Sequence, residues 1–401
     1  MTWLSDIVLQ HSELESPQSF WYWSALAAIS AIVKDNVWFD KKQYKLYPSI
    51  YVILYADSGV KKGPPINMAK QLVTLVNNTR IISGRSSIQG ILKKLSTAYT
   101  VPGGLVMNKA CGFICSSELS ASLVEDKAAL DILTDLFDRH YNSGDYESLL
   151  KMESFMLKDT TITLLGGINA AHAENFINRK DVQGGFIARS FIIHEELSGT
   201  INSLMFDLTN PPDYQKSAIY LREVSKLKGE FSMSHPTRMY FKEWYEGFKN
   251  NIISNKIQDP TGTLNRFDDA VLKVAMLISL GTDLSLIINE DIIDKAISRC
   301  ETLVGNVRKT TMASGKSEWV TQKSLLINEL IGRDGHMISK QMLNKKYWMH
   351  CGLDDWDNIT QQMEAAGILS IENLGSTVMY KMIDDQVEEW TNYFAGKSGK
   401  R

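Results

Sequence analysis

The sequence predicts an α/β protein with a parallel sheet, followed by a helical region and a small C-terminal unit of helices and a hairpin. Three observations support this fold class. Short apolar runs rich in β-branched residues alternate with helix-like stretches, as expected for strands covered on both faces; they are "SIYVILYA", "GFICSS", "TTITLLGGI" and "ARSFIIHEE". Residues 216–312 show only helical patterns. At 401 residues the chain is also too long for one small core.

Taken in order, the chain divides into five predicted segments. Residues 1–45 have the pattern of two amphipathic helices and a short extended piece, and residues 46–205 contain the sheet. The breaker "DLTNPPDYQ" opens the helical region 206–312. After the polar hinge "RKTTMASGKSE", residues 319–385 contain three helices and two strands joined by "LGS", which is the content of a winged helix-turn-helix. Residues 386–401 are expected to form a flexible tail.

The composition is that of an ordinary globular protein, with 44% apolar and 22% charged residues. The net charge of -3 neither favours nor excludes a nucleic-acid partner. The longest apolar run, 20–33, is shorter than the roughly twenty residues of a membrane span, so we expect a buried helix and no membrane partner. The four cysteines form no C-x-x-C pair, which favours reduced thiols in a cytoplasmic protein without a zinc site.

The stretch "YVILYADSGVKKGPPINMAKQL", 51–72, combines a strand, a small-residue loop, lysines and a helix. This is the order of parts in a phosphate-binding loop, in which backbone N–H groups at a helix N-terminus and one lysine hold the phosphates. Gly63 lacks the hydroxyl that would hold Mg²⁺, and Pro64 lacks an N–H donor. On this stretch alone an ordinary β-turn-α corner remains open. Lys62 is the candidate phosphate lysine, and the candidate nucleotide-binding residues are Ala56, Asp57, Ser58, Gly59, Val60, Lys61, Lys62 and Gly63.

Further stretches occur in an order that resembles AAA+ ATPases: "RIISGRSSIQGILKKL", "NKACGFICSSELSASL", "KMESFMLKDTTITLLGGINAA" and "GGFIARSFII". They are similar to the minichromosome maintenance helicase core, and more closely to the phage and mobile-element Rep-like replicative helicases related to it. Those relatives often write the loop as SG-x-[RK]-K-G, which "SGVKKG" matches. The resemblance covers roughly residues 1–310. It implies an AAA+ P-loop core, an α-helical lid over 206–312, and ATP and Mg²⁺ as cofactors.

The resemblance also implies catalytic roles for polar residues at several strand ends. Glu118 matches the Walker B catalytic acid, and Ser117 stands where a Mg²⁺-binding aspartate is expected. Asn169 matches the sensor-1 residue that orients the attacking water. Arg189 matches an arginine finger that reaches the γ-phosphate held by a neighbouring subunit. Arg266, in "LNRFDDAVLKVAMLISL", matches the sensor-2 arginine.

Each of these residues also has a simpler interpretation. A glutamate at a strand end is commonly solvated, an asparagine after Gly-Gly commonly lies in a turn, and an arginine before a strand commonly lies on the surface. Arg266, at a helix start, would pair with Asp269, three residues further along the same face.

Two predicted hairpins would contact DNA. In "RHYNSGDYESLLKMESFML", 139–157, the resemblance implies a pre-sensor-1 hairpin that points Lys151 into a central channel, with Arg139 and His140 as further contacts. The stretch "YTVPGGLVM", 99–107, would be the tip of a helix-2 insert hairpin. Such hairpins grip backbone phosphates without reading bases, although basic residues on hairpins are usually only solvated.

The resemblance therefore implies an ATPase that forms a homo-oligomeric ring, of hexamer type, and acts as a helicase or translocase on single-stranded DNA in phage or mobile-element replication. A primase or initiator would be its partner. The degenerate loop leaves a second hypothesis open, a non-hydrolysing DNA-binding ring or scaffold. The acidic helix "LDDWDNITQQMEAAG" favours a docking or regulatory role for the winged helix over tight phosphate contact.

Overall fold

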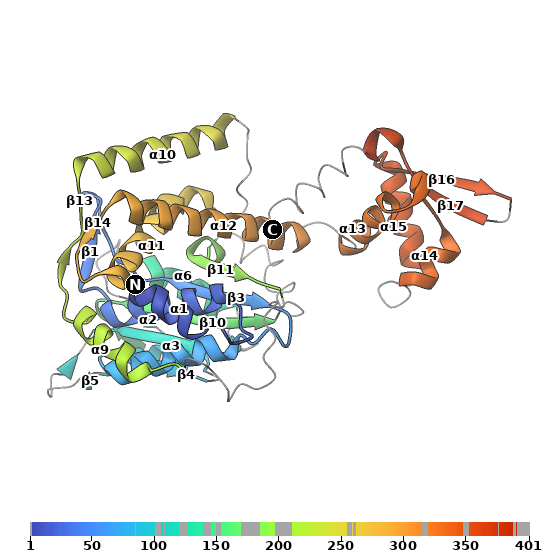
Figure 1. Cartoon of the computed structure of the whole chain (residues 1–401). Helices are drawn as coiled ribbons and strands as arrows, with labels where there is room; N and C mark the ends of the chain where they lie inside the picture. The colour runs from blue at the N-terminus through green and yellow to red at the C-terminus, as the bar shows by residue number, and fades with distance from the viewer. Residues whose placement is uncertain are drawn as a thin grey trace. The chain divides into compact units, whose positions relative to one another are not determined.

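The structure is a computed structural model that describes residues 2–84, 86–100, 106–107, 109–119, 127–138, 146–149, 154–169, 185–196, 211–254, 259, 262–314, 320–347, 353–375, 377–387 and 390. The chain divides into two compact units, Met1–Thr310 and Thr311–Arg401. In Figure 1 the first unit carries the labels α1 to α12, and the second carries α13 to β17. The segments predicted for 1–45, 46–205 and 206–312 therefore lie together in one unit.

A five-stranded parallel sheet forms the centre of the first unit, as the sequence predicts (Figure 1). All of its strand pairs are parallel. The strand β4 was not predicted, because its apolar part is only two isoleucines long at the edge of the sheet. In spatial order the strands are β11 (Ser190–His194), β3 (Tyr51–Ala56), β10 (Thr161–Asn169), β7 (Cys111–Ser116) and β4 (Arg80–Ser83).

Successive residues of β3 face opposite sides of the sheet and belong to two separate cores. Val52 and Leu54 belong to the larger core, whereas Tyr51 and Ile53 belong to the smaller one. This burial on both faces explains why the strands appear in the sequence as continuous apolar runs. The helices that contribute to the larger core include α2 (Gln18–Val33), α3 (Gly63–Val76) and α11 (Phe267–Thr282), and those of the smaller core are α4 (Ile88–Ser96) and α6 (Lys127–Asp138).

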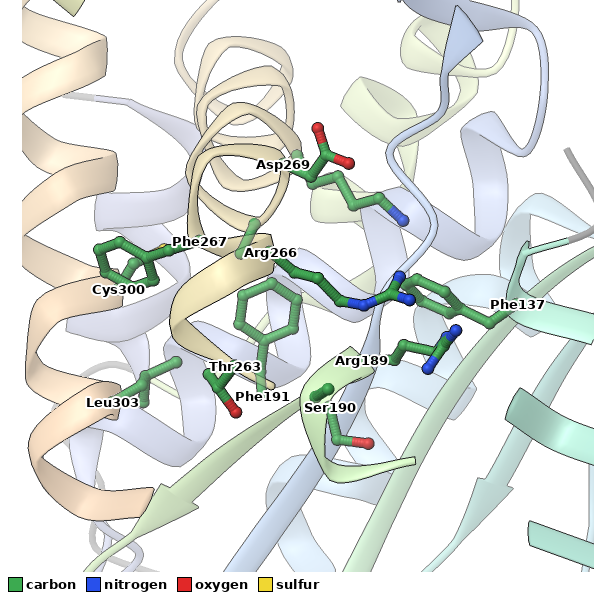
Figure 2. A pocket seen from close by; sticks show the side chains of 13 residues that line it. Phe137, Arg189, Ser190, Phe191, Thr263, Arg266, Phe267, Asp269, Cys300 and Leu303 are labelled. Atoms are coloured by element: carbon green, nitrogen blue, oxygen red, sulfur yellow. The ribbon is translucent and has the colours of Figure 1, made fainter. Parts of the chain in front are cut away.

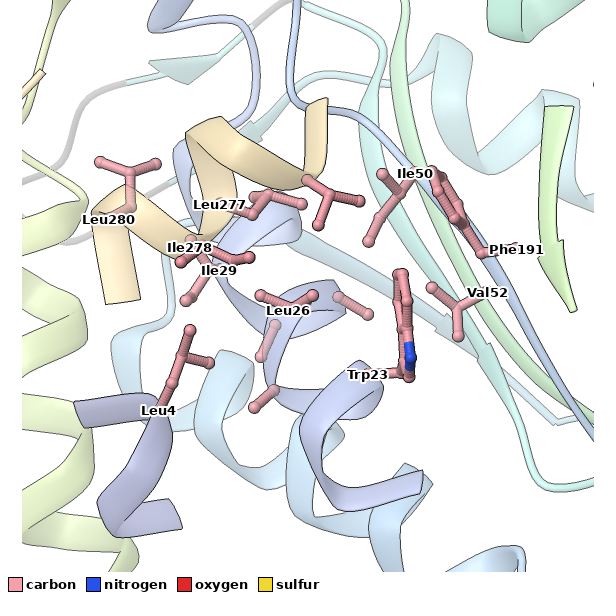
Figure 3. Packing of buried hydrophobic residues seen from close by; sticks show 14 of the residues in the cluster. Leu4, Trp23, Leu26, Ile29, Ile50, Val52, Phe191, Leu277, Ile278 and Leu280 are labelled. Atoms are coloured by element: carbon pink, nitrogen blue, oxygen red, sulfur yellow. The ribbon is translucent and has the colours of Figure 1, made fainter. Parts of the chain in front are cut away.

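Helix α2 is central to the larger core (Figure 3). The prediction of a buried helix at 20–33 is confirmed, because every one of these residues except the half-buried Tyr22 is buried. The prediction of an amphipathic helix is wrong for this element, since α2 is buried on all sides. It packs between the sheet and α11, and is preceded by the short α1 (Trp3–Gln10). Within the described part of the chain, no helix is long and apolar enough to span a membrane.

The region predicted as entirely helical also contains short strands. Its helices are α9 (Tyr214–Val224), α10 (His235–Ser254), α11 and α12 (Glu290–Ser314). The two-residue strands are β12 (Gly229–Glu230), β13 (Ser232–Met233) and β14 (Ile287–Ile288). β12 pairs with β1 (Val37–Asp40), which also pairs with β2 (Lys45–Leu46). Such brief strands show no periodic pattern, so the sequence did not reveal them. The predicted hinge is also partly wrong, because α12 continues through it to Ser314.

In the described part of the second unit, three longer helices and a three-stranded antiparallel sheet surround a core that includes Trp356 and Tyr380, and residues 384–387 are also helical. The helices are α13 (Val320–Ile331), α14 (Lys340–Tyr347) and α15 (Leu353–Ala365). The strands, in spatial order, are β15 (Met337–Ser339), β17 (Thr377–Met382) and β16 (Leu369–Leu374). The sequence predicts the three helices and the β16–β17 hairpin. It does not predict β15, because three residues between helices show no alternation.

Two short antiparallel hairpins occur where the sequence predicts them. One joins β5 (Tyr99–Thr100) to β6 (Val106–Met107), and the other joins β8 (Tyr146–Leu149) to β9 (Ser154–Leu157). The candidate DNA contacts Arg139, His140 and Lys151 lie outside the described residues.

Candidate functional site

The carboxyl ends of β3 and β10 form a topological switch point. From β3 the chain continues to β4 at one edge of the sheet, whereas from β10 it continues to β11 on the other side of β3. Ligands of open parallel sheets bind in the crevice outside the strand ends at such a point. Ala56 and Asn169, the last residues of the two strands, are paired in register. The predicted loop begins at Ala56 and therefore lies where this topology favours a ligand.

The loop turns sharply between β3 and α3. Gly59 has a φ of 94°, which glycine adopts at little cost, and Lys61 also has a positive φ, 45°. The N-terminal segment supports the turn, because Ser16 Oγ donates to the Lys61 carbonyl at 2.8 Å and Lys61 Nζ lies 3.8 Å from the Glu15 carboxylate. Among the predicted loop residues, the exposed ones are Asp57, Ser58, Gly59 and Lys61, the half-buried ones are Lys62 and Gly63, and the buried ones are Ala56 and Val60.

Lys62 directs its ammonium group back over the end of β3. Its Nζ donates to the carbonyl of Ala56 at 2.7 Å and to the carbonyl of Asp57 at 2.8 Å. Burial lowers the pKa of Lys62, and the negative charges of Asp57 and Glu118 oppose that effect. The ammonium group is therefore held at the mouth of the switch point by two neutral acceptors, which phosphate oxygens can replace.

Glu118 lies just beyond β7, on a segment that crosses the neighbouring strand β10. Leu119 N donates to the carbonyl of Gly167 at 2.8 Å, which fixes the crossing. A Cβ atom at Gly167 would collide with the Ser117 carbonyl, and one at Gly166 would collide with the Leu119 side chain. The Gly-Gly pair is thus required for close approach and does not form a turn.

Three predicted catalytic residues therefore lie at the same end of the sheet. Asn169 is half-buried at the end of β10, so its interpretation as a turn residue is wrong. Glu118 and Ser117 are exposed, which is also compatible with the simpler interpretation of Glu118 as a solvated residue. Lys62 is close enough to Glu118 for the carboxylate to affect its pKa.

The loop fits a phosphate group better than it fits Mg²⁺. A Cβ atom at Gly59 or Gly63 would meet no atom within 4 Å, so the space around the turn is open beside the Lys62 ammonium. Two prolines in the first turn of α3 reduce the number of N–H donors that the helix offers. Among the described residues no group of three or more His, Cys, Asp or Glu side chains is placed to hold a metal. Mg²⁺ carried by a nucleotide takes several ligands from phosphate and water, so Glu118 and Ser117 are the side chains that would complete its shell.

A second group of charged residues surrounds Asp138, the last residue of α6. Arg189, at the end of the 3₁₀ turn η2 (Ile187–Arg189), donates from Nε to Asp138 Oδ2 at 2.9 Å and also from Nη2 to the same oxygen. Arg266, at the end of the 3₁₀ turn η3 (Leu264–Arg266), has Nη1 3.6 Å from Asp138 Oδ1. Figure 2 shows both guanidinium groups beside Phe137. Two arginines predicted from separate motifs thus meet at one carboxylate.

The simpler predictions for both arginines are wrong. The Arg189 side chain is only 9% exposed, so it is not a solvated surface residue. The ion pair that Arg266 makes is with Asp138, whereas Asp269 accepts hydrogen bonds from Lys41 at 2.6 Å and from Tyr44. Lys41 comes from the N-terminal segment, which the local i,i+3 argument could not take into account.

Lys273 is a buried lysine in the same group. Its Nζ donates to the carbonyl of Ser49 at 3.0 Å and lies 3.8 Å from the centroid of the Phe137 ring. Burial lowers the pKa of Lys273 to about 7, and the positive charges of Arg189 and Arg266 add to this effect while Asp269 and Asp138 oppose it. Lys273 and the two arginines line one cavity of about 50 Å³. The sequence did not identify Asp138 or Lys273 as members of a site.

The two groups of residues lie at opposite ends of the sheet. Arg189 directly precedes β11, whose first residue pairs with the first residue of β3, whereas Lys62 follows the last residue of β3. The six residues of β3 span about 17 Å at the usual rise of a strand. A phosphate held by Lys62 is therefore out of reach of Arg189 and Arg266 in the same chain.

Replacement of Gly167 by alanine tests the crossing that positions Glu118. We expect Gly167→Ala to lower the free energy of unfolding of the first unit by about 1–3 kcal/mol, because the new methyl group meets a backbone oxygen that cannot rotate away. Urea unfolding measures the loss. Gly247→Ala is the control, since its Cβ would meet nothing within 4 Å and it lies in α10, where alanine favours the helix. Equal stability of the two variants would contradict the assigned crossing.

A scan against protein-family models finds no match to this chain, and a search of curated proteins finds none either. The function of the protein is therefore inferred from the arrangement of residues at the two ends of the sheet.

Proposed function

We propose that this protein is an AAA+-type ATPase that assembles into a ring and moves along single-stranded DNA as a helicase or translocase in phage or mobile-element replication. The observation that carries the proposal is the placement of Lys62, Glu118 and Asn169 at one end of the sheet and of Arg189 and Arg266 at the other. A phosphate bound by one copy can meet the arginines only of another copy. Head-to-tail contacts form a ring when the rotation between copies closes, and a closed hexamer is the proposed form.

Within such an interface each residue has a distinct task. Lys62 would exchange its two carbonyl acceptors for the phosphate oxygens of ATP, and Glu118 would accept a proton from the attacking water. Asn169, paired in register with Ala56, would orient that water. Arg189 and Arg266 of the neighbouring copy would stabilise the charge that develops on the transferred group. Mg²⁺, brought in with ATP, would neutralise part of the phosphate charge.

The DNA-contacting parts of the proposal rest on the two hairpins. The β8–β9 hairpin and the β5–β6 hairpin would contact the DNA strand. Lys151, which lies between β8 and β9 in the sequence, and Arg139 and His140, which precede β8 in the sequence, are the proposed basic contacts. Hairpins of this kind hold the DNA backbone without reading its sequence. Residues 206–312 would act as a lid, and residues 319–385 as a winged helix that docks a partner such as a primase or initiator. The acidic α15 favours a protein partner over DNA for this unit.

A second candidate function is a ring that binds nucleotide and DNA without hydrolysis. Gly63 supplies no hydroxyl for Mg²⁺, the first turn of α3 contains two prolines, and Ser117 occupies the position of a metal-binding acid. These features reduce the binding of Mg²⁺ more than they reduce the binding of phosphate.

Measurement of phosphate release from ATP, with and without single-stranded DNA, tests the proposal. We expect DNA-stimulated release by the wild type and a loss of about 100-fold or more in Lys62→Ala, because the variant removes the cation at the loop. Lys226→Ala is the control, since Lys226 is 67% exposed and pairs locally with Glu223. Binding of an ATP analogue without release would favour the second candidate. The absence of both binding and release would contradict both.

A further inference from the structure

The Asp138 carboxylate occupies one edge of the Arg189 guanidinium. Two nitrogens of that guanidinium donate to one oxygen, Oδ2, and the third nitrogen donates to the carbonyl of Gly185 at 2.8 Å. A guanidinium binds carboxylates and phosphates through the same donors. Because Asp138 occupies the edge formed by Nε and Nη2, another anion can bind through these two donors only if Asp138 gives way.

The other oxygen of Asp138 is poorly satisfied. Oδ1 is buried and makes no hydrogen bond, although Arg266 Nη1 lies 3.6 Å away. A buried acceptor without a hydrogen bond costs free energy that a better-matched ligand would recover. The Asp138 carboxylate therefore holds the two arginines less tightly than an anion that offered an oxygen to each of them.

The adjoining cavity has the charge and size for a small oxyanion. Its volume of about 50 Å³ is room for more than one water molecule, and its lining includes Arg189, Arg266 and Lys273. Asp269 also lines it, but its carboxylate is engaged by Lys41 and Tyr44. The two arginines thus bring two positive charges to this cavity, and only the Asp138 carboxylate opposes them without another cation.

We propose that Asp138 is a positioning residue that pairs with Arg189 and Arg266 while no anion is bound. A phosphate oxyanion that enters this cavity displaces the Asp138 carboxylate. The anion would be the terminal phosphate of a nucleotide carried by a second copy of this chain. This identity of the anion rests on the function proposed above, whereas the competition with Asp138 does not. In this arrangement the Arg189 side chain is only 9% exposed, so a subunit whose neighbour carries no nucleotide keeps that guanidinium largely away from solvent, whereas the Arg266 side chain is 42% exposed.

Binding of inorganic phosphate to the full chain tests the proposal. The measurements are made in a Lys62→Ala background, which removes the loop at the other end of the sheet as a competing site. We expect Asp138→Asn to bind phosphate about tenfold more tightly than the parent, because the asparagine has the same shape but forms no charge-assisted pair with the arginines. Adding Arg189→Ala to Asp138→Asn is expected to abolish the gain. A merely structural role of Asp138 would not produce tighter binding, so an unchanged or weaker affinity in a folded Asp138→Asn protein overturns the proposal.

A second measurement does not depend on the folding of that variant. The Arg189 Nε–H group donates to Asp138, and its NMR signal can be assigned by comparison with Arg189→Lys. In the Lys62→Ala protein with Asp138 intact, we expect this signal to move as inorganic phosphate is added, whereas an unmoved signal at saturating phosphate overturns the proposal. Neither measurement uses ATP hydrolysis. A protein that passes both and releases no phosphate from ATP would refute the proposed function and leave the competition at Asp138 standing.

Discussion

Mixing Lys62→Ala subunits with Arg189→Ala subunits is expected to restore ATPase activity that neither variant has alone. Each variant should lose about 100-fold or more, because one lacks the cation of the loop and the other lacks a guanidinium at the transferred phosphate. In rings assembled at random from equal amounts of the two variants, about a quarter of the interfaces join an intact Lys62 to an intact Arg189. Recovery therefore approaches that fraction of the wild-type rate. A titration of one variant into the other, followed by phosphate release, measures it.

The control is a chain that carries both substitutions. Mixed with Lys62→Ala subunits, it offers no interface with an intact lysine, so no activity should return. Arg189→Lys is a companion variant that keeps a positive charge beside the Asp138 carboxylate and guards against loss of folding. If single variants that remain folded and assembled show no recovery on mixing, the two residues do not act across an interface and the ring proposal fails.

Replacing Lys273 with methionine is expected to stabilise the protein at neutral pH. The lysine is fully enclosed, and folding lowers its pKa from 10.5 to about 7. The lost hydrogen bond to the Ser49 carbonyl offsets part of the gain, at a cost of about 1 kcal/mol. The lowered pKa corresponds to a cost of about 4 kcal/mol at pH 7, so a net gain of about 3 kcal/mol remains, which thermal or urea unfolding of the full chain detects. Lys295→Met is the control, because Lys295 is 55% exposed and pairs with Asp291 on its own helix.

The gain from Lys273→Met should shrink as the pH rises. Between about pH 7 and pH 10.5 the unfolded wild type binds the Lys273 proton and the folded protein does not, so the wild type becomes more stable relative to the variant. Below about pH 7 both states are protonated and the difference levels off. A difference that does not change between pH 7 and pH 10 would mean that Lys273 stays charged in the folded protein.

The sequence predicts those parts of the fold that depend on local pattern. The β3 strand and its loop could be recognised because an apolar run, turn residues, a lysine and a helical pattern follow one another directly in the sequence. The β4 edge strand could not, because two isoleucines between polar residues are too short a run. The helical region was predicted as wholly helical because its two-residue strands gain their pairing from distant segments, as β12 does from β1.

The candidate site was predictable only at its loop end. Asp138 is separated from Arg189 by 51 residues, and no sequence spacing indicates that α6 and η2 meet. The local pairing expected for Arg266 failed because Lys41, far away in the chain, takes Asp269. Lys273 did leave a signal, a single lysine inside the apolar run "AVLKVAMLISL", and such a residue must be either neutralised or paired when its helix is buried.

The burial of α2 has a consequence for synthesis of the chain on the ribosome. The helix ends at Val33, yet it packs against α11, which ends at Thr282. Translation of the intervening residues, about 250, takes roughly 12–50 s at about 5–20 residues per second. Throughout that interval α2, which carries tryptophans and isoleucines, lacks its packing against α11. We therefore expect slow elongation upstream of α11 to increase aggregation of the nascent chain, because apolar surface of α2 stays exposed for longer.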